Sequence, residues 1–228
     1  MTTSPLRALC RCPARLAGLI LCAAVLSAPA GVAQAAEPFK ILAFGDSLVH
    51  GYGLPAGTTF PEQLEAALRD RGLDVEVING GNSGDTTAAG RARLDWALAD
   101  QPDAVLVELG ANDSLRGIDP ADTYRNLDAI LTRLTAAGLP VLLAGMLAPR
   151  NLGPDYAAAF DAIFPRLAER HGVALYPFFL DGVAMDPALN QPDGIHPNAA
   201  GVGVIVERIT PSVIRLLEAA RSGANAGG

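Results

Sequence analysis

The chain has 228 residues, half of them hydrophobic, and a formal net charge of −7 at pH 7. Its three cysteines, Cys10, Cys12 and Cys22, all lie near the start. An acidic chain without a basic stripe disfavours nucleic acid and anionic membranes as partners. A chain without later cysteines cannot depend on disulfides for its fold.

The first 36 residues have the pattern of an export signal. A positive start, an apolar run and an A-x-A cleavage site follow one another: Arg7, Arg11 and Arg15, then residues 16–26, then Ala33-Gln34-Ala35. We predict a signal peptide at residues 1–36, cleaved near Ala35 or Ala36, and a periplasmic or secreted bacterial protein. A retained signal anchor is the alternative, although the apolar run is short for a membrane span. A lipoprotein is disfavoured because Leu21 stands where a lipobox needs a small residue.

Removal of that leader leaves 192 residues with 14 basic and 24 acidic side chains, a net charge of −10. This length suits one domain with its own core. We predict a single domain at residues 37–221, a flexible tail at 222–228, and a monomer.

Apolar runs and helical patterns alternate along this domain. Five short runs are typical of buried strands: Ile41–Phe44, Val75–Ile78, Ala104–Leu109, Val141–Ala144 and Val173–Tyr176. Three sets of apolar residues recur at helical spacing between them: Phe60, Leu64 and Leu68; Tyr124, Leu127, Ile130, Leu131 and Leu134; Tyr156, Phe160, Ile163, Phe164 and Leu167. This alternation predicts an α/β fold, a three-layer α/β/α sandwich around a central five-stranded parallel sheet.

Glycine, asparagine and proline indicate where the helices begin and end. Gly72, Gly138 and Gly172 stand where helices should stop, and Asn198 can cap the last helix. Pro211 lies inside that last helix, and should kink it or divide it in two.

Four separated blocks carry the residue types of a catalytic site: Gly45-Asp46-Ser47-Leu48, Ser83-Gly84-Asp85, Gly110-Ala111-Asn112-Asp113 and Asp193-Gly194-Ile195-His196. Ser47, Gly84 and Asn112 each follow a strand end, and in an open parallel sheet ligands bind beyond the carboxyl ends of the strands. A nucleophile, a base, an orienting carboxylate and oxyanion donors are the parts that serine ester hydrolysis needs. Read singly, Ser47 is also a helix cap, and Gly84 and Asp193 are also turn residues.

These blocks resemble the GDSL, or SGNH, hydrolases, and the resemblance runs from about Phe39 to Leu217. Three stretches are similar to the periplasmic thioesterase I, lysophospholipase and arylesterase subgroup: residues 43–48, 106–113 and 193–198. The resemblance implies a flavodoxin-like SGNH-hydrolase fold and hydrolysis of thioesters, aryl esters or lysophospholipids through an acyl-enzyme. It implies Ser47, Asp193 and His196 as the catalytic triad, with an oxyanion hole formed by the Ser47 and Gly84 amides and the Asn112 side chain.

The local pattern fits this class better than the α/β-hydrolase class. Val49 stands where a G-x-S-x-G elbow needs its second glycine, and Asp193 is only three residues before His196. The other two histidines are weaker candidates for the catalytic base. His171 sits at a helix end, where a structural role is expected, and His50 has no nearby carboxylate partner in the sequence.

Several carboxyl groups lie next to these blocks. We expect Asp46 to point away from the site and brace its loop, and Asp85 and Asp113 to cap helices. Glu108 is a charge inside an apolar strand, where burial would raise its pKa.

We expect the acyl chain to lie in an apolar cleft walled by Leu115, Ile118, Leu147 and Tyr156, and a small acyl ester or lipid to be the substrate. No cofactor and no metal is expected, because no cluster of ligands has metal-binding spacing. Two alternatives remain open. One is a polysaccharide O-deacetylase on the same fold, and the other is a non-catalytic binding protein.

Overall fold

Five parallel strands form one sheet in the order β2-β1-β3-β4-β5. The strands are β1 (Phe39–Gly45), β2 (Val75–Gly81), β3 (Ala104–Glu108), β4 (Val141–Ala144) and β5 (Ala174–Tyr176). They are the five predicted apolar runs, with ends that differ by a few residues. The five-stranded parallel sheet is therefore confirmed.

The structure is a computed structural model that describes residues 37–226. The predicted signal peptide at residues 1–36 lies outside the described residues, and so do the three cysteines.

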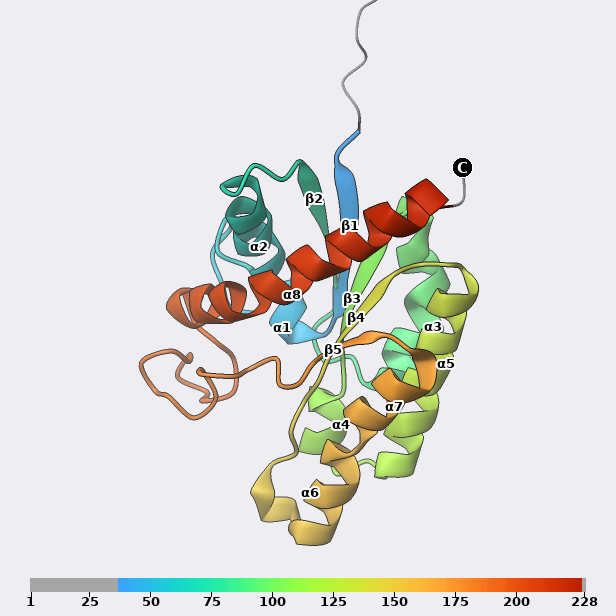
Figure 1. Ribbon diagram of the computed structural model, residues 1–228. Coiled ribbons are helices and arrows are strands. Elements are labelled where there is room, and N and C mark those ends of the chain that lie inside the picture. Colours follow the sequence, from blue (N-terminus) through green and yellow to red (C-terminus); the bar gives the residue numbers. More distant parts are fainter. Residues whose placement is uncertain (1–36, 227–228) are drawn as a thin grey trace, which may run out of the picture. The chain divides into compact units, whose positions relative to one another are not determined.

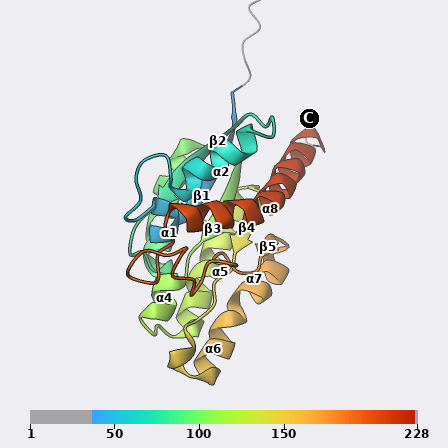
Figure 2. The ribbon, with the colours of Figure 1, turned by 90° about the vertical axis from the view of Figure 1, so that its left-hand side faces the viewer.

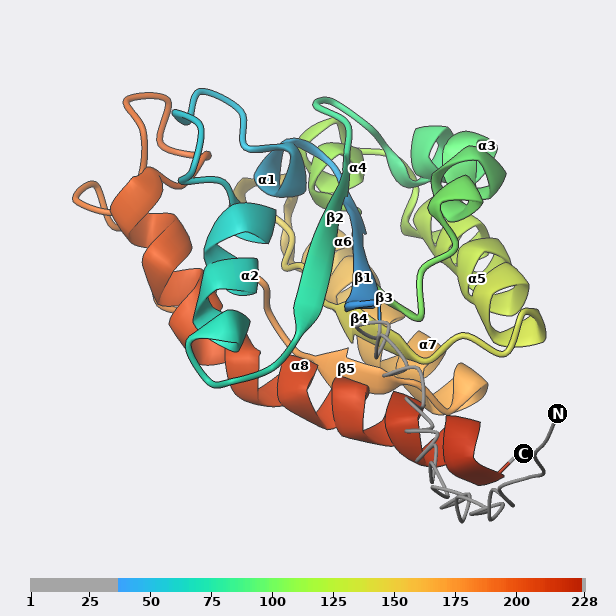
Figure 3. The same ribbon diagram turned by 90° about the horizontal axis from the view of Figure 1, so that it is seen from above.

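Helices cover both faces of the sheet, as Figures 1 and 3 show. The helical elements are α1 (Ser47–His50), α2 (Phe60–Arg69), α3 (Thr87–Ala97), η1 (Leu98–Asp100), α4 (Ala111–Leu115), α5 (Pro120–Ala136), η2 (Arg150–Leu152), α6 (Pro154–Asp161), α7 (Ile163–His171) and α8 (Ala199–Ala226). Helices α2 and α8 pack together on one face, and α3, α5 and α7 pack on the other. The three-layer α/β/α sandwich is therefore confirmed.

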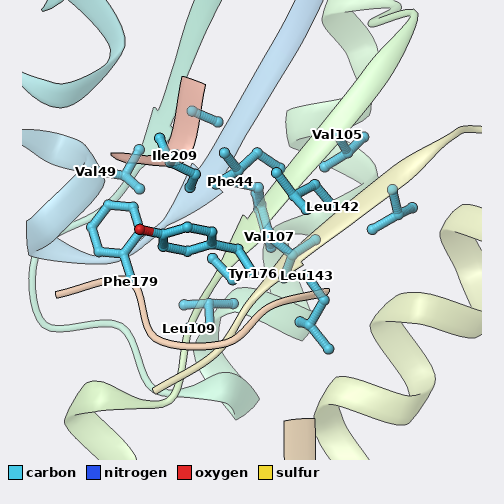
Figure 4. Packing of buried hydrophobic residues seen from close by; sticks show 14 of the residues in the cluster. Phe44, Val49, Val105, Val107, Leu109, Leu142, Leu143, Tyr176, Phe179 and Ile209 are labelled. Carbon is cyan, nitrogen blue, oxygen red and sulfur yellow. The ribbon is translucent and has the colours of Figure 1, made fainter. Parts of the chain in front are cut away.

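The core lies on both sides of the sheet, because the central strands β3 and β4 are buried on both faces. Phe44, Val107 and Leu143 are in register on β1, β3 and β4, so they share one face, and all three are fully buried. Figure 4 shows these side chains gathered beside the strands. Phe44 lies under the Arg93 guanidinium of α3, with 4.3 Å between the guanidinium carbon and the ring centroid.

The helix ends follow the sequence signals. Gly72, Gly138 and Gly172 all have positive φ, the left-handed conformation in which glycine has no Cβ penalty. Asn198 accepts a hydrogen bond from the Gly201 N–H at 3.0 Å, so it caps α8.

The structure adds detail to three expectations about helices. The stripe from Tyr156 to Leu167 is two helices, α6 and α7, because Pro165 has no N–H to donate to the carbonyl one turn earlier. Of the two effects expected of Pro211, division of the helix does not occur, because α8 is continuous through it. Helix α8 also continues to Ala226, so residues 222–226 of the expected tail are helical. There the Ser222 hydroxyl bonds the Glu218 carbonyl oxygen one turn earlier.

The end of β2 contains two glycines. Asn79, Gly80 and Gly81 continue β2 and pair with the end of β1. Glycine suits the last two positions because the chain is crowded there: a Cβ on Gly80 would meet Leu42 Cδ1 at 2.6 Å, and one on Gly81 would meet the backbone of α1.

The sheet has its switch point between β1 and β3. The chain leaves β1 toward β2 on one side and returns to β3 on the other. Ligands of open parallel sheets bind beyond the carboxyl ends of the strands at such a point. Here α1 follows β1 and α4 follows β3, and Figure 2 shows the long loop that precedes α8 at the same edge of the sheet.

Phe60→Ala should lower the free energy of unfolding by about 3–5 kcal/mol. Phe60 is fully buried and its ring meets that of Phe179 edge-on at 5.0 Å, so truncation leaves a cavity between α2 and the loop before α8. Urea unfolding followed by circular dichroism measures the change. Trp96→Ala is the control, because Trp96 is 77% exposed and its loss should change stability by about 0.5 kcal/mol or less. Equal effects of the two substitutions would contradict the assignment of Phe60 to the core.

Candidate active site

Ser47, His196 and Asp193 form one line of hydrogen bonds at the carboxyl edge of the sheet. His196 Nε2 lies 3.0 Å from Ser47 Oγ, and His196 Nδ1 lies 2.7 Å from Asp193 Oδ2. Ser47 opens α1 directly after β1, whereas the other two residues lie on the loop before α8. The chain therefore brings together, across 149 positions of sequence, the three residues that the sequence indicated as a triad.

Asp193 is held as an acceptor by its own turn. Its Oδ1 accepts the backbone N–H groups of Ile195 and His196, both at 3.0 Å. Desolvation would raise the pKa of Asp193, but the hydrogen bonds from the His196 side chain and from these two N–H groups outweigh it and lower that pKa to about 2. The carboxyl group is thus ionised throughout the neutral range. The turn role and the contact with His196 coexist.

Contacts that no sequence pattern predicts hold the His196 loop in place. Tyr52 packs its ring against the imidazole of His196, with 4.7 Å between ring centroids. Gln191 donates its side-chain N–H groups to the carbonyl oxygens of Tyr52 and Pro197, at 2.7 and 3.0 Å. Gln191 thereby ties the loop after α1 to the loop that carries His196. No local sequence pattern signals such a contact, because its partners are 139 residues apart.

The predicted oxyanion donors lie on three loops at the same edge. Within the described part of the chain, the backbone N–H groups of Ser47 and Gly84 donate to no protein acceptor. Gly84 has φ +86°, a conformation that suits glycine. The Asn112 amide donates one N–H to Asp46 Oδ2 at 3.0 Å, which leaves its second N–H available.

Arg116 links two of these loops, although it belongs to none of the four sequence blocks. Its Nη2 donates to the Gly84 carbonyl oxygen at 2.9 Å and to Asn112 Oδ1 at 3.3 Å. Because Asn112 Oδ1 is thereby held as an acceptor, the nitrogen of that amide is turned toward Asp46 and the site. Arg116 lies four residues after Asn112, at the end of α4, and side chains at this spacing are neighbours on a helix. This spacing is the sequence signal that points to Arg116.

Asp46 braces its loop, as predicted, but it does not point away from the site, because its Oδ2 accepts the Asn112 amide. It is fully buried, and its Oδ1 accepts the Leu48 N–H at 3.0 Å, so it caps α1. Burial, the largest effect, raises the pKa of Asp46 to about 6, although its hydrogen bonds lower it. Glu108 is also fully buried, and burial together with the neighbouring Asp46 charge raises its pKa well above the ordinary value. The expected effect of burial on Glu108 is confirmed.

The two expected helix caps differ from each other. Asp113 accepts the Thr87 N–H at 2.8 Å and so caps the start of α3, although it lies on α4. Asp85 does not cap a helix. It forms an ion pair with Arg93 at 2.5 Å, and Thr86 caps α3 instead. Arg93 also donates to the Gly45 carbonyl oxygen at 2.8 Å, so its guanidinium lies at the end of β1.

The other histidines lie outside the triad. His171 Nε2 contacts Asp128 Oδ1 at 2.8 Å, between α7 and α5, so it has a carboxylate partner on another helix. His50 is exposed, and its Nδ1 lies 3.3 Å from the Gly81 carbonyl oxygen.

The four expected acyl-cleft residues lie on loops and helices after β3 and β4. Leu115 and Leu147 are 50% and 38% exposed. Tyr156 and Ile118 are half-buried and touch, because the Tyr156 hydroxyl donates to the Ile118 carbonyl oxygen at 2.8 Å. Exposed apolar side chains of this kind can contact a ligand, but their contact with an acyl chain stays a prediction.

Two hollows lie elsewhere. One of about 620 Å³ lies at the opposite edge of the sheet, between the starts of β4 and β5 and the later turns of α8. The other, of about 390 Å³, borders the His196 loop and is lined by Met185, Pro187, Gln191 and Gly194 among others. The larger hollow is remote from Ser47, so its size does not connect it with the triad.

Comparison with known proteins points to one family. The GDSL-like Lipase/Acylhydrolase family model matches residues 43–204. An arylesterase of Vibrio mimicus is 41% identical over 185 residues, which cover 81% of this chain and 92% of that protein. The thioesterase 1/protease 1/lysophospholipase L1 of Escherichia coli (strain K12) is 42% identical over 166 residues, which cover 72% of this chain and 78% of that protein. The crystal structure of AlinE4, an SGNH-hydrolase family esterase, matches with a TM-score of 0.68 and 48% identity, over 81% of this chain and 99% of that chain.

The free energy of unfolding of Glu108→Gln should rise relative to that of the natural chain as pH increases. The raised pKa of Glu108 means that the folded chain binds its proton more tightly than the unfolded chain does. That contribution to stability is complete below the unfolded pKa and is lost as pH rises toward the folded pKa, with a slope of at most about 1.4 kcal/mol per pH unit. Glutamine does not titrate and loses nothing.

Urea unfolding of both proteins between about pH 5 and pH 8 measures this difference. Glu218→Gln, on the exposed side of α8, is the control for simple loss of a carboxyl group. A stability difference between Glu108→Gln and the natural chain that is constant over this range would show that Glu108 does not hold its proton in the folded state.

Proposed function

We propose a mechanism, a substrate class and a location for this chain, which belongs to the GDSL-like lipase/acylhydrolase family and hydrolyses ester bonds. One observation carries the mechanism. Ser47 Oγ lies 3.0 Å from His196 Nε2, and the opposite nitrogen of that imidazole lies 2.7 Å from Asp193. A serine becomes a nucleophile when an adjacent base accepts its proton and a third group orients the base.

In the first half-reaction Ser47 Oγ attacks the carbonyl carbon of the ester, and His196 Nε2 accepts the hydroxyl proton. The tetrahedral intermediate collapses when His196 gives that proton to the leaving alcohol or thiol, and the acyl group stays on Ser47. In the second half-reaction water attacks the acyl carbon, His196 accepts a proton from the water, and then returns it to Ser47 as the carboxylic acid leaves. Asp193 remains ionised and stabilises the imidazolium.

The negative oxygen of each tetrahedral intermediate takes hydrogen bonds from the Ser47 N–H, the Gly84 N–H and the second N–H of Asn112. Support comes from the free state of the two backbone donors and from the fixed orientation of the Asn112 amide. Donors that are already aimed at the developing charge need no reorganisation during the reaction, which is why such donors lower the barrier.

The substrates are aryl esters, acyl thioesters or lysophospholipids, in which one acyl chain lies against Leu115, Ile118, Leu147 and Tyr156. The relatives are named as an arylesterase and as a thioesterase and lysophospholipase. The exposed leucines at 115 and 147 follow β3, which lies beside β1, and β4, which is the next strand after β3 in the sheet. Acyl-CoA is disfavoured as the natural substrate if the chain is exported, because that pool is cytosolic.

The location is the periplasm or the medium, and the working form is a monomer without a nucleic-acid partner. The arginine-rich start, the apolar run and the A-x-A site support export. Among residues 37–226, no helix is long and apolar enough to span a membrane.

Ser47→Ala should lower kcat by roughly 10⁴-fold or more on a short p-nitrophenyl ester, because the acyl-enzyme can no longer form. Steady-state kinetics and circular dichroism measure the activity and the fold. Ser212→Ala, at a buried serine of α8, is the matched control and should keep its activity. Retention of more than a few per cent of activity by Ser47→Ala, roughly a 30-fold loss or less, would disprove the nucleophile assignment.

The exported protein should begin at Ala36 or Glu37. Cleavage after the A-x-A site leaves a chain without cysteine, so a reducing agent should not change its stability. N-terminal sequencing of protein from the periplasm or medium checks the cleavage. Met1 at the start of the exported protein would contradict it.

Longer acyl chains should raise kcat/KM until the cleft is full, by up to about 0.8 kcal/mol, or roughly fourfold, for each added CH₂. A series of p-nitrophenyl esters from acetyl to palmitoyl measures this dependence. Leu147→Trp should shorten the preferred chain and leave acetyl ester hydrolysis unchanged. If acetyl and octanoyl esters are hydrolysed equally and Leu147→Trp affects both alike, the cleft assignment is wrong and polysaccharide deacetylation becomes the better hypothesis.

A further inference from the structure

Directly behind Ser47, two carboxyl groups are buried together. Asp46 precedes Ser47, and Glu108 ends β3, and neither is exposed to solvent. The Asp46 N–H reaches Glu108 Oε2 at 3.4 Å, which brings the two buried residues into contact. Glycine at 45 makes this possible, since a Cβ there would lie 2.7 Å from Glu108 Oε2. The mechanism above uses neither carboxyl group.

The hydrogen-bond donors around the pair decide which member holds the charge. Asp46 receives two donors at 3.0 Å, the Leu48 N–H on Oδ1 and the Asn112 amide on Oδ2. Glu108 receives one long contact, and its Oε1 has no partner among the described residues. An ionised carboxylate is an acceptor only and needs donors when it is buried, whereas a neutral acid needs fewer. Two adjacent buried carboxyl groups share one proton, and these contacts place it on Glu108.

The charge on Asp46 then acts on both halves of the proposed site. Through Leu48 it caps α1, the short helix that presents Ser47. Through Asn112 it holds the side-chain oxyanion donor from one end, while Arg116 holds the amide oxygen from the other. If Asp46 were protonated, one of its oxygens would become a donor and would face a donor already there.

We propose that Glu108 is a positioning residue: as a neutral carboxylic acid it donates its proton to Asp46, and so keeps Asp46 ionised to hold Ser47 and Asn112 in place. This inference rests on the proposed function, because it assigns the pair a role through the nucleophile and the oxyanion donor. It adds a requirement for a proton at one buried site that does not itself contact the reacting atoms.

The other charged groups around the pair do not change this assignment. The charge of His196, which contacts Ser47, favours ionised Asp46. On α3, Arg93 is already paired with Asp85. On α4, Asp113 accepts the N–H and hydroxyl of Thr87 and the hydroxyl of Thr123. Directly after α4, Arg116 donates to Gly84 and Asn112. Burial and the Asp46 charge, which raise the pKa of Glu108, agree with a proton on Glu108.

Three substitutions separate the donor role from simple packing. Glu108→Gln keeps the shape and offers an amide N–H to Asp46, while Glu108→Met keeps the volume and offers no donor. Asp46→Asn removes the charge itself. Asp128→Asn, at a carboxylate between α5 and α7, is the control for loss of a charge elsewhere. For each variant, kcat and KM on p-nitrophenyl butyrate are measured between about pH 5 and pH 9, together with thermal unfolding.

Glu108→Gln should keep kcat within about twofold of the natural chain and should leave the acid limb of the pH profile in place. Glu108→Met should lower kcat roughly tenfold near neutral pH and move the acid limb to higher pH, because Asp46 loses the hydrogen bond that favours its ionised form. Asp46→Asn should lower kcat about 10–100-fold at every pH, with KM changed less than about threefold. Asp128→Asn should change neither kcat nor the profile. Infrared difference spectra should show a protonated carboxylic acid near neutral pH that Glu108→Gln abolishes.

The inference would be overturned if Glu108→Met had the kcat of the natural chain and the acid limb of its pH profile stayed in place. It would also be overturned if Glu108→Gln and Glu108→Met lost kcat equally. If Glu108→Met does not fold, Glu108→Gln and the infrared band still decide the protonation state, and a missing band overturns it. Ser47→Ala is measured in parallel. If it remains active, the proposed function fails, whereas if it is inactive while Glu108→Met behaves as the natural chain, only this inference fails.

Discussion

The pairing of β1 with β3 is the constraint on which the site depends. In this register Gly45 lies beside Glu108, so the two strands end together and their loops begin side by side. Ser47 is two residues beyond the end of β1 and Asn112 four beyond the end of β3. A register shift of one residue would exchange the two faces of β3 and move Val105 and Val107 to the opposite helix layer, so the packing of these two residues also fixes the position of Asn112. The catalytic geometry is in this sense a consequence of the core.

Much of this arrangement follows from the sequence because its signals are local. Apolar runs, helical stripes and glycines at helix ends identified the five strands and most helices, and the four blocks identified the residues that meet at the sheet edge. The errors came from competing local effects. Pro165 divides a stripe whose apolar spacing is unbroken. Asp85 has the composition of a cap, but Arg93 two turns later takes it as an ion-pair partner.

The supports of the site could not be predicted, because each joins residues far apart in sequence. Gln191 ties Tyr52 to the His196 loop, and Arg116 ties the Gly84 loop to Asn112. These contacts matter because both loops otherwise lie outside regular structure and would lose little by moving. A loop that carries a base must be held within a fraction of an ångström for proton transfer. The residues that do so carry no motif of their own.

Three carboxyl groups near one serine differ in ionisation because their surroundings differ. Asp193 is solvent-accessible and receives two backbone N–H groups and the imidazole, which lower its pKa to about 2. Asp46 is buried but has two donors, and its pKa rises only to about 6. Glu108 is buried with almost no donors, and burial raises its pKa well above the ordinary value. The number of donors offered to each carboxyl group, more than its distance from Ser47, therefore sets its charge, and the charge sets which neighbour it can orient.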